Sequence, residues 1–357
     1  MRKILQSLLL KPILWIMRKF SSAPDRERIF EALTKLKDRL HADPGKKGFI
    51  IPLDISRGKF ILFSDQHKGA KDGADDFRNC ESNYVSALRH YDQEDFHLIC
   101  LGDSEELWEN TLLQVKKHNV LSFEAERKFA MRNAFTKIFG NHDLDWEINP
   151  AVEKDLKELY HTRVAVLEAV ILQCTIKQKS LRIFCTHGHQ GDLQSDGNLF
   201  SKFFVSKIWA PLQAYLQINP NTPAYNDTLK TEHNSIMYDW SSRQKNLVLI
   251  TGHTHQPVFE SLTHFERLQR QEGLKLTESK SDSHDSVLQI PSLDFFSKIR
   301  PTYFNTGCCC FSDGDITGIE ISEKCIKLIK WKKQNGKSVR IELENISLEQ
   351  LINQLSE

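Results

Sequence analysis

Residues 60–67 read FILFSDQH, in which four apolar residues are followed by an aspartate and, two positions later, a histidine. Short apolar runs of this kind are typical of buried strands. Four later segments also place side chains that can bind a metal just after an apolar run: Asp103, Asn141 with His142, His187, and His253 with His255. Sites in open α/β sheets form at the carboxyl ends of strands. The repetition therefore predicts one shared centre.

The residue types indicate what this centre binds. Carboxylate, amide oxygen and imidazole suit manganese, iron, zinc or nickel rather than Cu(I). Besides His142, the segments supply two aspartates, one asparagine and four histidines. These seven side chains can fill two sites if one carboxylate bridges both metals.

The five segments, in their order along the chain, resemble the motifs of the calcineurin-like metallophosphoesterase superfamily. They read SDQH at 64–67, GD at 102–103, GNHD at 140–143, THGH at 186–189 and GHTH at 252–255. The resemblance extends over residues 58–330. It implies an α/β fold of four layers, in which two mixed β-sheets are flanked by helices, and a metal-dependent phosphoesterase activity.

The resemblance also implies how the ligands divide: Asp103 as the bridge, Asp65, His67 and His255 at the first metal, and Asn141, His187 and His253 at the second. Two metals about 3.5–4 Å apart can hold both the attacking and the departing oxygens of a phosphoryl displacement. We expect two divalent cations, manganese first, with iron, zinc, cobalt and nickel as alternatives. A hydroxide between them would attack a phosphoester substrate.

His142 receives a different role from the resemblance. It lies beside the substrate phosphate, where it stabilises the transition-state charge or protonates the leaving oxygen. Asp143 is expected to orient its imidazole through the other ring nitrogen, and Asp145 is the alternative.

Three further residues are expected near the centre. His189 would neighbour a ligand or the substrate. Asp192 would either support a ligand imidazole or lie at a helix N-terminus. Asn305, within YFNTG at 303–307, would either support the site or belong to a plain strand-to-turn segment.

The string GDSEELW at 102–108 looks like the G-D-x-x-E-x-W motif of UDP-2,3-diacylglucosamine hydrolases. This similarity implies an alternative function, hydrolysis of a lipid-linked UDP-sugar pyrophosphate at the membrane surface. Those enzymes carry arginine in place of His142, and they lack a block like residues 1–45. An alternative of another class is a metal-bound scaffold without catalysis.

The chain divides into three predicted parts. Residues 1–45 form a helical, basic appendage, 46–345 the phosphoesterase domain, and 346–357 a short helix. Within the domain we expect a helical cap at 192–245, which either shapes the substrate pocket or is a helical pair buried on the domain, and a mobile polar loop at 266–288. The net charge of +1 implies no general attraction to nucleic acid.

Residues 1–20 combine apolar residues with lysine and arginine. They are too short and too charged for a membrane-spanning helix, and they suit either a helix at the membrane surface or one packed on the protein. The segment lacks a good signal-peptide cleavage site. The eight cysteines show no zinc-ribbon spacing, which favours a reducing compartment. We therefore expect a cytoplasmic protein, with peripheral contact to the inner membrane face as a further expectation.

Periodicity predicts helices and strands in the remainder of the chain. The helices are expected at 25–40, 76–91, 123–137 and 226–243, and the strands at 164–174, 180–186, 316–321, 325–331 and 339–343.

Overall fold

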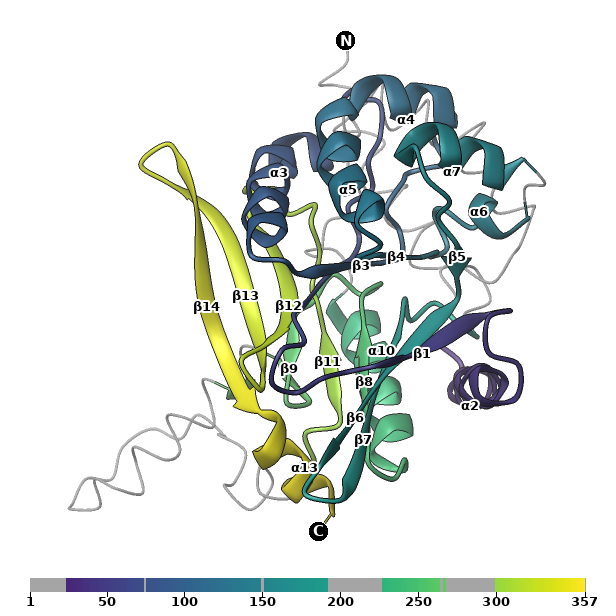
Figure 1. Ribbon diagram of the computed structural model, residues 1–357, viewed down its shortest axis with the longest axis vertical. Coiled ribbons are helices and arrows are strands. Elements are labelled where there is room, and N and C mark those ends of the chain that lie inside the picture. Colours follow the sequence, from purple (N-terminus) through teal and green to yellow (C-terminus); the bar gives the residue numbers. More distant parts are fainter. Residues whose placement is uncertain are drawn as a thin grey trace.

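A computed structural model describes residues 24–73, 75–148, 151–191, 227–263, 266–267 and 299–356. Two seven-stranded sheets, each with parallel and antiparallel pairs, form its centre (Figure 1). The first sheet has the order β1 (Gly48–Pro52), β6 (Ala169–Ile176), β7 (Lys179–Thr186), β8 (Leu247–Thr251), β11 (Tyr303–Asn305), β9 (Val258–Phe259) and β10 (Leu262–Thr263). The second has the order β14 (Lys337–Ser347), β13 (Cys325–Gln334), β12 (Ile316–Ser322), β2 (Phe60–Phe63), β3 (His97–Leu101), β4 (Phe135–Ile138) and β5 (Val166–Leu167).

Each sheet contains a set of three neighbouring parallel strands that leads to the predicted centre. In the second sheet β2 pairs in parallel with β3, and β3 with β4. In the first sheet β8 pairs in parallel with both β7 and β11. Parallel strands end at one edge of their sheet, so each set brings its ligand-bearing turns together.

The two sheets pack face to face around the largest hydrophobic core. Leu62 and Ile99 of the second sheet join Ile183 and Val248 of the first, and all four side chains are fully buried. Because strand side chains alternate between faces, the neighbouring residue Ile61 packs on the other side, against helices.

Helices cover the outer faces of both sheets (Figure 1). The second sheet is covered by α3 (Phe77–Gln93) and α5 (Val120–Met131), and the first by α2 (Arg26–Ala42) and α10 (Asp227–Ser242). The predicted class, a four-layer α/β fold with two mixed sheets flanked by helices, is confirmed. The remaining described helices are α4 (Leu112–His118), α6 (Asp145–Ile148), α7 (Val152–Tyr160) and α13 (Leu348–Ser356).

The α2 helix shows how local sequence sets one of these layers. The Asp25 side chain caps its N-terminus by accepting a hydrogen bond from the Arg28 amide at 2.9 Å. Ile29, Leu33 and Leu36 recur at helical spacing and are buried against the first sheet and α10. The helix predicted at 25–40 is thus confirmed.

The predicted C-terminal end of one helix is wrong. The segment 123–137 was expected to be helical throughout, but α5 ends at Met131 and Asn133 adopts a φ of 58°. Residues 135–138 instead form β4, because this segment pairs in parallel with β3 and buries Thr136, Lys137 and Ile138. The edge strand β1 and the helix α7 were not predicted.

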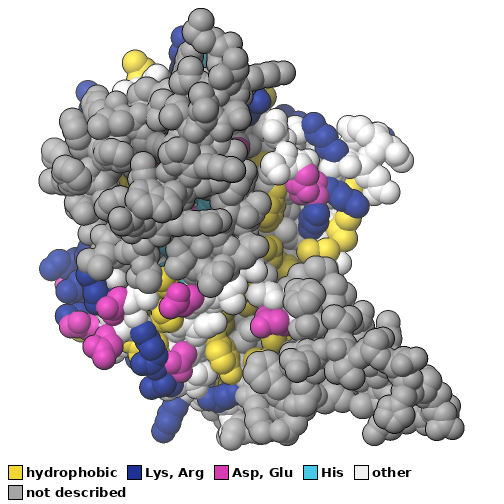
Figure 2. All heavy atoms as spheres, turned by 180° about the vertical axis from the view of Figure 1, so that it is seen from behind, with side chains coloured by type: hydrophobic (Ala, Val, Ile, Leu, Met, Phe, Trp, Pro, Cys, Tyr) yellow, Lys and Arg dark blue, Asp and Glu magenta, His cyan; other side chains and the backbone are white. Residues whose placement is uncertain are grey.

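Several expectations concern segments beyond the described residues. Residues 1–20, Asp192, the greater part of the cap at 192–245 and nearly all of the loop at 266–288 fall there. The described part of the cap begins at 227 and includes α10, which packs on the first sheet. Among the described helices, none has both the length and the apolar character that crossing a bilayer requires. On the face shown in Figure 2, acidic and basic side chains lie interspersed on the described surface.

Four fully buried charges lie between the second sheet and its helices. The Lys68 ammonium lies 2.5 Å from the Glu126 carboxylate and 3.2 Å from Glu105, and Lys137 lies 2.7 Å from Glu105. Two tyrosines and one tryptophan donate further hydrogen bonds to the carboxylates: Tyr84 and Tyr160 to Glu126, and Trp146 to Glu105. Burial raises the pKa of Glu105, but the two lysines outweigh it and bring that pKa to about 2. The four charges therefore balance one another.

We expect Glu126→Gln to lower the free energy of unfolding by about 3–5 kcal/mol, because it leaves the buried Lys68 ammonium with one carboxylate fewer. Urea denaturation of metal-free protein measures this loss. The same substitution at Glu158, an exposed partner of Lys116, should change stability little. Equal effects of the two substitutions would contradict the importance of the buried network.

Candidate metal centre

The predicted ligands lie on turns with an unusual backbone. Asp65, His67, Asp103, His253 and His255 all have φ between 48° and 67°. Residues other than glycine rarely adopt this left-handed conformation, and each such residue costs on the order of 1–3 kcal/mol. Five strained residues at the ends of three strands mark a geometry that the surrounding fold enforces.

The first group of side chains gathers around His67 and His255. Their Nε2 atoms lie 3.3 Å apart. Asp65 Oδ1 is 3.2 Å from the Nε2 atom of His255, and Asp103 Oδ2 is 3.7 Å from that of His67. Two imidazoles and two carboxylates thus converge on one position.

The second group gathers around His187. Its Nε2 atom lies 3.1 Å from Asp103 Oδ2 and 3.3 Å from Asn141 Oδ1. His253 joins this group, since ligand atoms of Asp103, His187 and His253 all lie within 4.8 Å of one another. The structure therefore brings all seven predicted ligands into two groups, and Asp103 Oδ2 lies between them.

The Nδ1 atoms of three of these histidines are held from outside. His187 Nδ1 bonds to the Leu101 carbonyl at 2.9 Å, and His67 Nδ1 to Glu106 Oε2 at 2.9 Å. His255 Nδ1 lies 3.6 Å from the Cys310 sulfur. Outer partners of this kind fix the tautomer and orientation of metal-binding imidazoles. They leave Nε2 directed into the centre.

The carboxylates are positioned by equally local contacts. The His142 amide donates to Asp103 Oδ1 at 2.8 Å, which leaves Oδ2 facing both groups. The Ser64 hydroxyl donates to Asp65 and lies 2.6 Å from the Thr306 hydroxyl, while the His253 amide donates to Asp65 at 3.0 Å. Each aspartate is therefore fixed by a residue from another ligand-bearing turn.

The charges of the centre favour cations. Burial raises the pKa of Asp65, but His255 outweighs it and lowers that pKa to about 2. Burial lowers the pKa of His67, yet Glu106 and Asp103 outweigh it and raise that pKa to about 10. The field of the carboxylates thus stabilises positive charge, whether on an imidazole or on a metal. A metal binds neutral imidazole, so its binding releases protons.

Two glycines make room for the ligands. A Cβ atom on Gly140 would lie 2.2 Å from Asp103 Oδ1, and one on Gly102 would lie 2.5 Å from the His187 ring. Gly102 also has a φ of 88°. Glycine precedes these ligands because any larger residue would displace the aspartate or the imidazole.

His142 lies beside the first group without belonging to the seven, and ligand atoms of His67, Asp103 and His142 all lie within 4.8 Å of one another. Its ring stacks on Trp108 with centroids 4.6 Å apart, and it meets the edge of His67 at 4.5 Å. Its Nδ1 atom lies 2.6 Å from Glu106 Oε2. The same carboxylate oxygen thus contacts both His67 and His142.

The structure corrects the expected partner of His142. Asp143 accepts hydrogen bonds from the backbone amides of Gly140 at 2.6 Å and Ser104 at 2.8 Å, so it shapes the turns around the bridge. The carboxylate that contacts the His142 ring belongs to Glu106. The string at 102–108 contains Glu106, but nothing in it shows that this side chain turns toward the histidines.

Two other predicted residues lie close by. Asn305 is buried and donates to the Gly252 carbonyl at 2.7 Å, which ties β11 to the turn that carries His253 and His255. His189 is buried beside His187, with ring centroids 5.4 Å apart. Asp145 begins α6.

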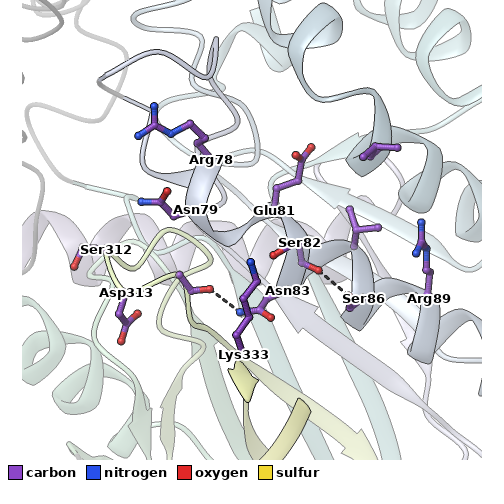
Figure 3. A pocket seen from close by; sticks show the side chains of 13 residues that line it. Arg78, Asn79, Glu81, Ser82, Asn83, Ser86, Arg89, Ser312, Asp313 and Lys333 are labelled. Carbon is purple, nitrogen blue, oxygen red and sulfur yellow. Dashed lines mark hydrogen bonds between the residues drawn. The ribbon is translucent and has the colours of Figure 1, made fainter. Parts of the chain in front are cut away.

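A separate pocket of about 650 Å³ lies between the outer side of α3 and the loop at 312–314 (Figure 3). Arg78, Arg89 and Lys333 supply its positive charge, and Glu81 and Asp313 its negative charge. Among the described residues that line it, none is a predicted ligand. The pocket is therefore distinct from the centre.

Two groups of possible metal ligands that share a carboxylate lie at the meeting edge of two parallel strand sets on an α/β sandwich, an arrangement that suits a metal-dependent hydrolase. The calcineurin-like phosphoesterase family model matches residues 58–257, which is 200 of the 357 residues. The chain belongs to this family. The match supports a metal-dependent phosphoesterase in general terms.

Comparison with solved structures gives distant neighbours. Vacuolar protein sorting 29 from Cryptosporidium parvum shares 12% identity at a TM-score of 0.32, covering 81% of this chain and 98% of that one. A single mutant of Vps29 from Entamoeba histolytica shares 12% identity at a TM-score of 0.30, covering 80% and 99%. No curated protein matches the sequence.

We expect Asp103→Asn to weaken binding at both metal positions, because the substitution removes a charge that faces both groups. Metal analysis after equilibrium dialysis against manganese should show far fewer than two ions per chain. Asp313→Asn, at an exposed site, serves as the matched control and should leave metal content unchanged. Two retained ions in Asp103→Asn would refute its place between the groups.

Proposed function

We propose that this chain is a two-metal phosphoesterase in which His142 assists hydrolysis. One observation supports the proposal above all: two groups of ligands meet at Asp103 Oδ2, and His142 lies next to them without being one of the seven. In this proposal Asp65, His67 and His255 hold the first metal and Asn141, His187 and His253 the second.

Two bound divalent cations supply Lewis-acid stabilisation of the phosphoryl group and an activated water at neutral pH. The chain supplies the orientation. Gly140 leaves room for the Asp103 carboxylate, and Gly102 leaves room for the His187 ring. The His142 amide, which donates to Asp103, lies on the same turn as Asn141. Manganese is the first expectation, with iron, zinc, cobalt and nickel as alternatives.

His142 would act on the leaving oxygen. Burial raises the pKa of Glu106, but His142 and His67 outweigh it and lower that pKa to about 2, so the carboxylate is charged at neutral pH. Its contact with Nδ1 leaves Nε2 as the nitrogen that can donate a proton to the leaving oxygen. Stacking on Trp108 holds the ring in place.

A second candidate substrate is a lipid-linked UDP-sugar pyrophosphate. The observation in its favour is the string at 102–108, in which Glu106 and Trp108 contact the residue that would act on the substrate. Peripheral membrane contact through residues 1–20 belongs to this candidate. Parallel assays with a soluble phosphodiester and a lipid pyrophosphate in vesicles separate the two substrates.

A non-catalytic scaffold is the alternative of another class. It predicts two bound metals without turnover of phosphomonoesters, phosphodiesters or pyrophosphates. We also propose a cytoplasmic setting, which the eight free cysteines support, since reducing compartments keep thiols unpaired.

We expect His142→Ala to slow hydrolysis by roughly 10²–10⁴-fold, the usual contribution of a positioned acid. Metal content should remain at two ions per chain, because His142 is not among the proposed ligands. Aryl phosphates with good leaving groups should lose less activity than alkyl phosphates, since they need less protonation.

The matched control is His118→Ala, at an exposed position on α4, which should leave turnover unchanged. Loss of a metal in His142→Ala would show that His142 is a ligand. Equal losses with good and poor leaving groups would exclude its role as an acid.

A further inference from the structure

A further histidine lies at the second ligand group, on the helix α10. His233 is buried, at 6% exposure, and its ring lies beside the His253 ring with centroids 5.2 Å apart. The His253 ring lies at the same distance from the His187 ring on another side. His233 therefore adjoins a proposed ligand of the second metal, although it lies outside the five ligand-bearing segments of the sequence.

The packing of α10 places His233 at the edge of the first sheet where the ligands lie. Met237 and Trp240 follow His233 at helical spacing, and both are buried in one hydrophobic cluster with residues of β8. A short turn connects the end of α10 to the start of β8, so the helix and the strand run in opposite directions. The first half of α10 therefore lies at the carboxyl end of β8.

A hydrogen bond connects His233 to the turn that follows β7. The Nε2 atom of His233 lies 2.9 Å from the Gly188 carbonyl oxygen, and this nitrogen donates because a carbonyl can only accept. Gly188 directly follows His187, and its amide donates to Gln190 Oε1 at 3.1 Å. Side chains thus hold the peptide groups on both sides of Gly188.

The next residue of α10 holds the turn that follows β8. The Asn234 side chain donates to Gln256 Oε1 at 2.9 Å and accepts from the Thr254 hydroxyl at 3.1 Å. Thr254 lies between the two histidines of that turn. The helix α10 therefore bonds to both turns that supply histidines to the second group.

We infer that His233 is a positioning residue for the second metal, because its Nε2–H group holds the turn that carries His187. The inference rests on the proposed two-metal centre. His233 is not assigned as a ligand: its Nε2 atom bonds to the Gly188 carbonyl, and the ligand atoms within 4.8 Å of one another here belong to Asp103, His187 and His253. The loss of such an outer partner typically weakens metal binding about 10–100-fold.

Two substitutions separate the hydrogen bond from the packing of the ring. His233→Phe keeps a ring beside His253 but removes the donor, whereas His233→Gln keeps a donor on a side chain of similar reach. The metal-free full chain is titrated with Mn²⁺, and the free ion is measured by electron paramagnetic resonance. We expect two ions per unaltered chain, one of them bound roughly 10–100-fold more weakly in His233→Phe, and nearly unchanged affinities in His233→Gln.

Chains that hold a single metal show which position is affected. His67→Ala removes a proposed ligand of the first metal, and in that chain His233→Phe should weaken the ion that remains. His187→Ala removes a proposed ligand of the second metal, and in that chain His233→Phe should leave the remaining ion unaffected.

The matched control is Ser241→Ala, which removes a buried hydrogen bond between α10 and Thr302. Ser241 lies eight residues further along α10 than His233. A purely structural loss in this helix should lower the urea midpoint of the metal-free chain and leave both metal affinities unchanged.

The outcomes separate this inference from the proposed function. Two ions bound with unchanged affinity in His233→Phe would overturn the inference and leave the two-metal proposal standing. Fewer than two ions in the unaltered chain would overturn both. Equal weakening in His233→Gln would show that the donor does not hold the turn, and equal weakening in Ser241→Ala would show a general loosening of α10. Either result would overturn the inference.

Hydrogen exchange on the unaltered chain covers the case in which His233→Phe does not fold. Coupling between two sites is reciprocal, so metal binding should stabilise the helix that positions the ligands. Two equivalents of Mn²⁺ should slow amide exchange at 230–236 as well as in the turns at 186–189 and 252–255. Slower exchange in the two turns with unchanged exchange at 230–236 would overturn the inference.

Discussion

The buried pairing of Lys68 and Lys137 with Glu105 and Glu126 determines where the ligand-bearing turns lie. Lys68 directly follows His67, and Glu105 comes two residues after Asp103. Lys137 stands on β4, four residues before Asn141. Each charge is too costly to leave unpaired in a dry interior, so the turns after β2 and β3 must keep their places relative to β4 and α5. The metal centre is built on this arrangement.

The strained turns explain why such support is needed. Asp65, His67 and Asp103 lie in left-handed conformations that an isolated peptide would avoid. Hydrogen bonds among the turns, from Ser64 and His253 to Asp65 and from His142 to Asp103, hold these conformations. A rigid set of ligands of this kind binds a metal without a further entropic cost of ordering its own side chains.

The sequence predicts the fold class and the division of the ligands through its resemblance to a known family, and it predicts one shared centre through a local pattern. An apolar run that ends in Asp65 or His187 marks a strand end, and parallel strand ends meet. What the sequence does not show are contacts between distant segments. Cys310 is 55 residues from His255, and only the path of the chain after β11 brings them together. The contact of Glu106 with His142 was not predicted for a related reason, because the direction of the Glu106 side chain depends on the turn after β3. The end of α5 was misplaced because pairing with β3 overrides the helical pattern.

The seven proposed ligands follow strands of both sheets: Asp65, His67, Asp103 and Asn141 follow strands of the second sheet, and His187, His253 and His255 follow strands of the first. Ions bound there would cross-link the two β-sheets. Any species that binds only the folded state stabilises it in proportion to the logarithm of its free concentration. The abundance of this protein in a cell would then depend on the supply of metal. A chain made when metal is scarce would unfold more often and would be degraded faster by proteases.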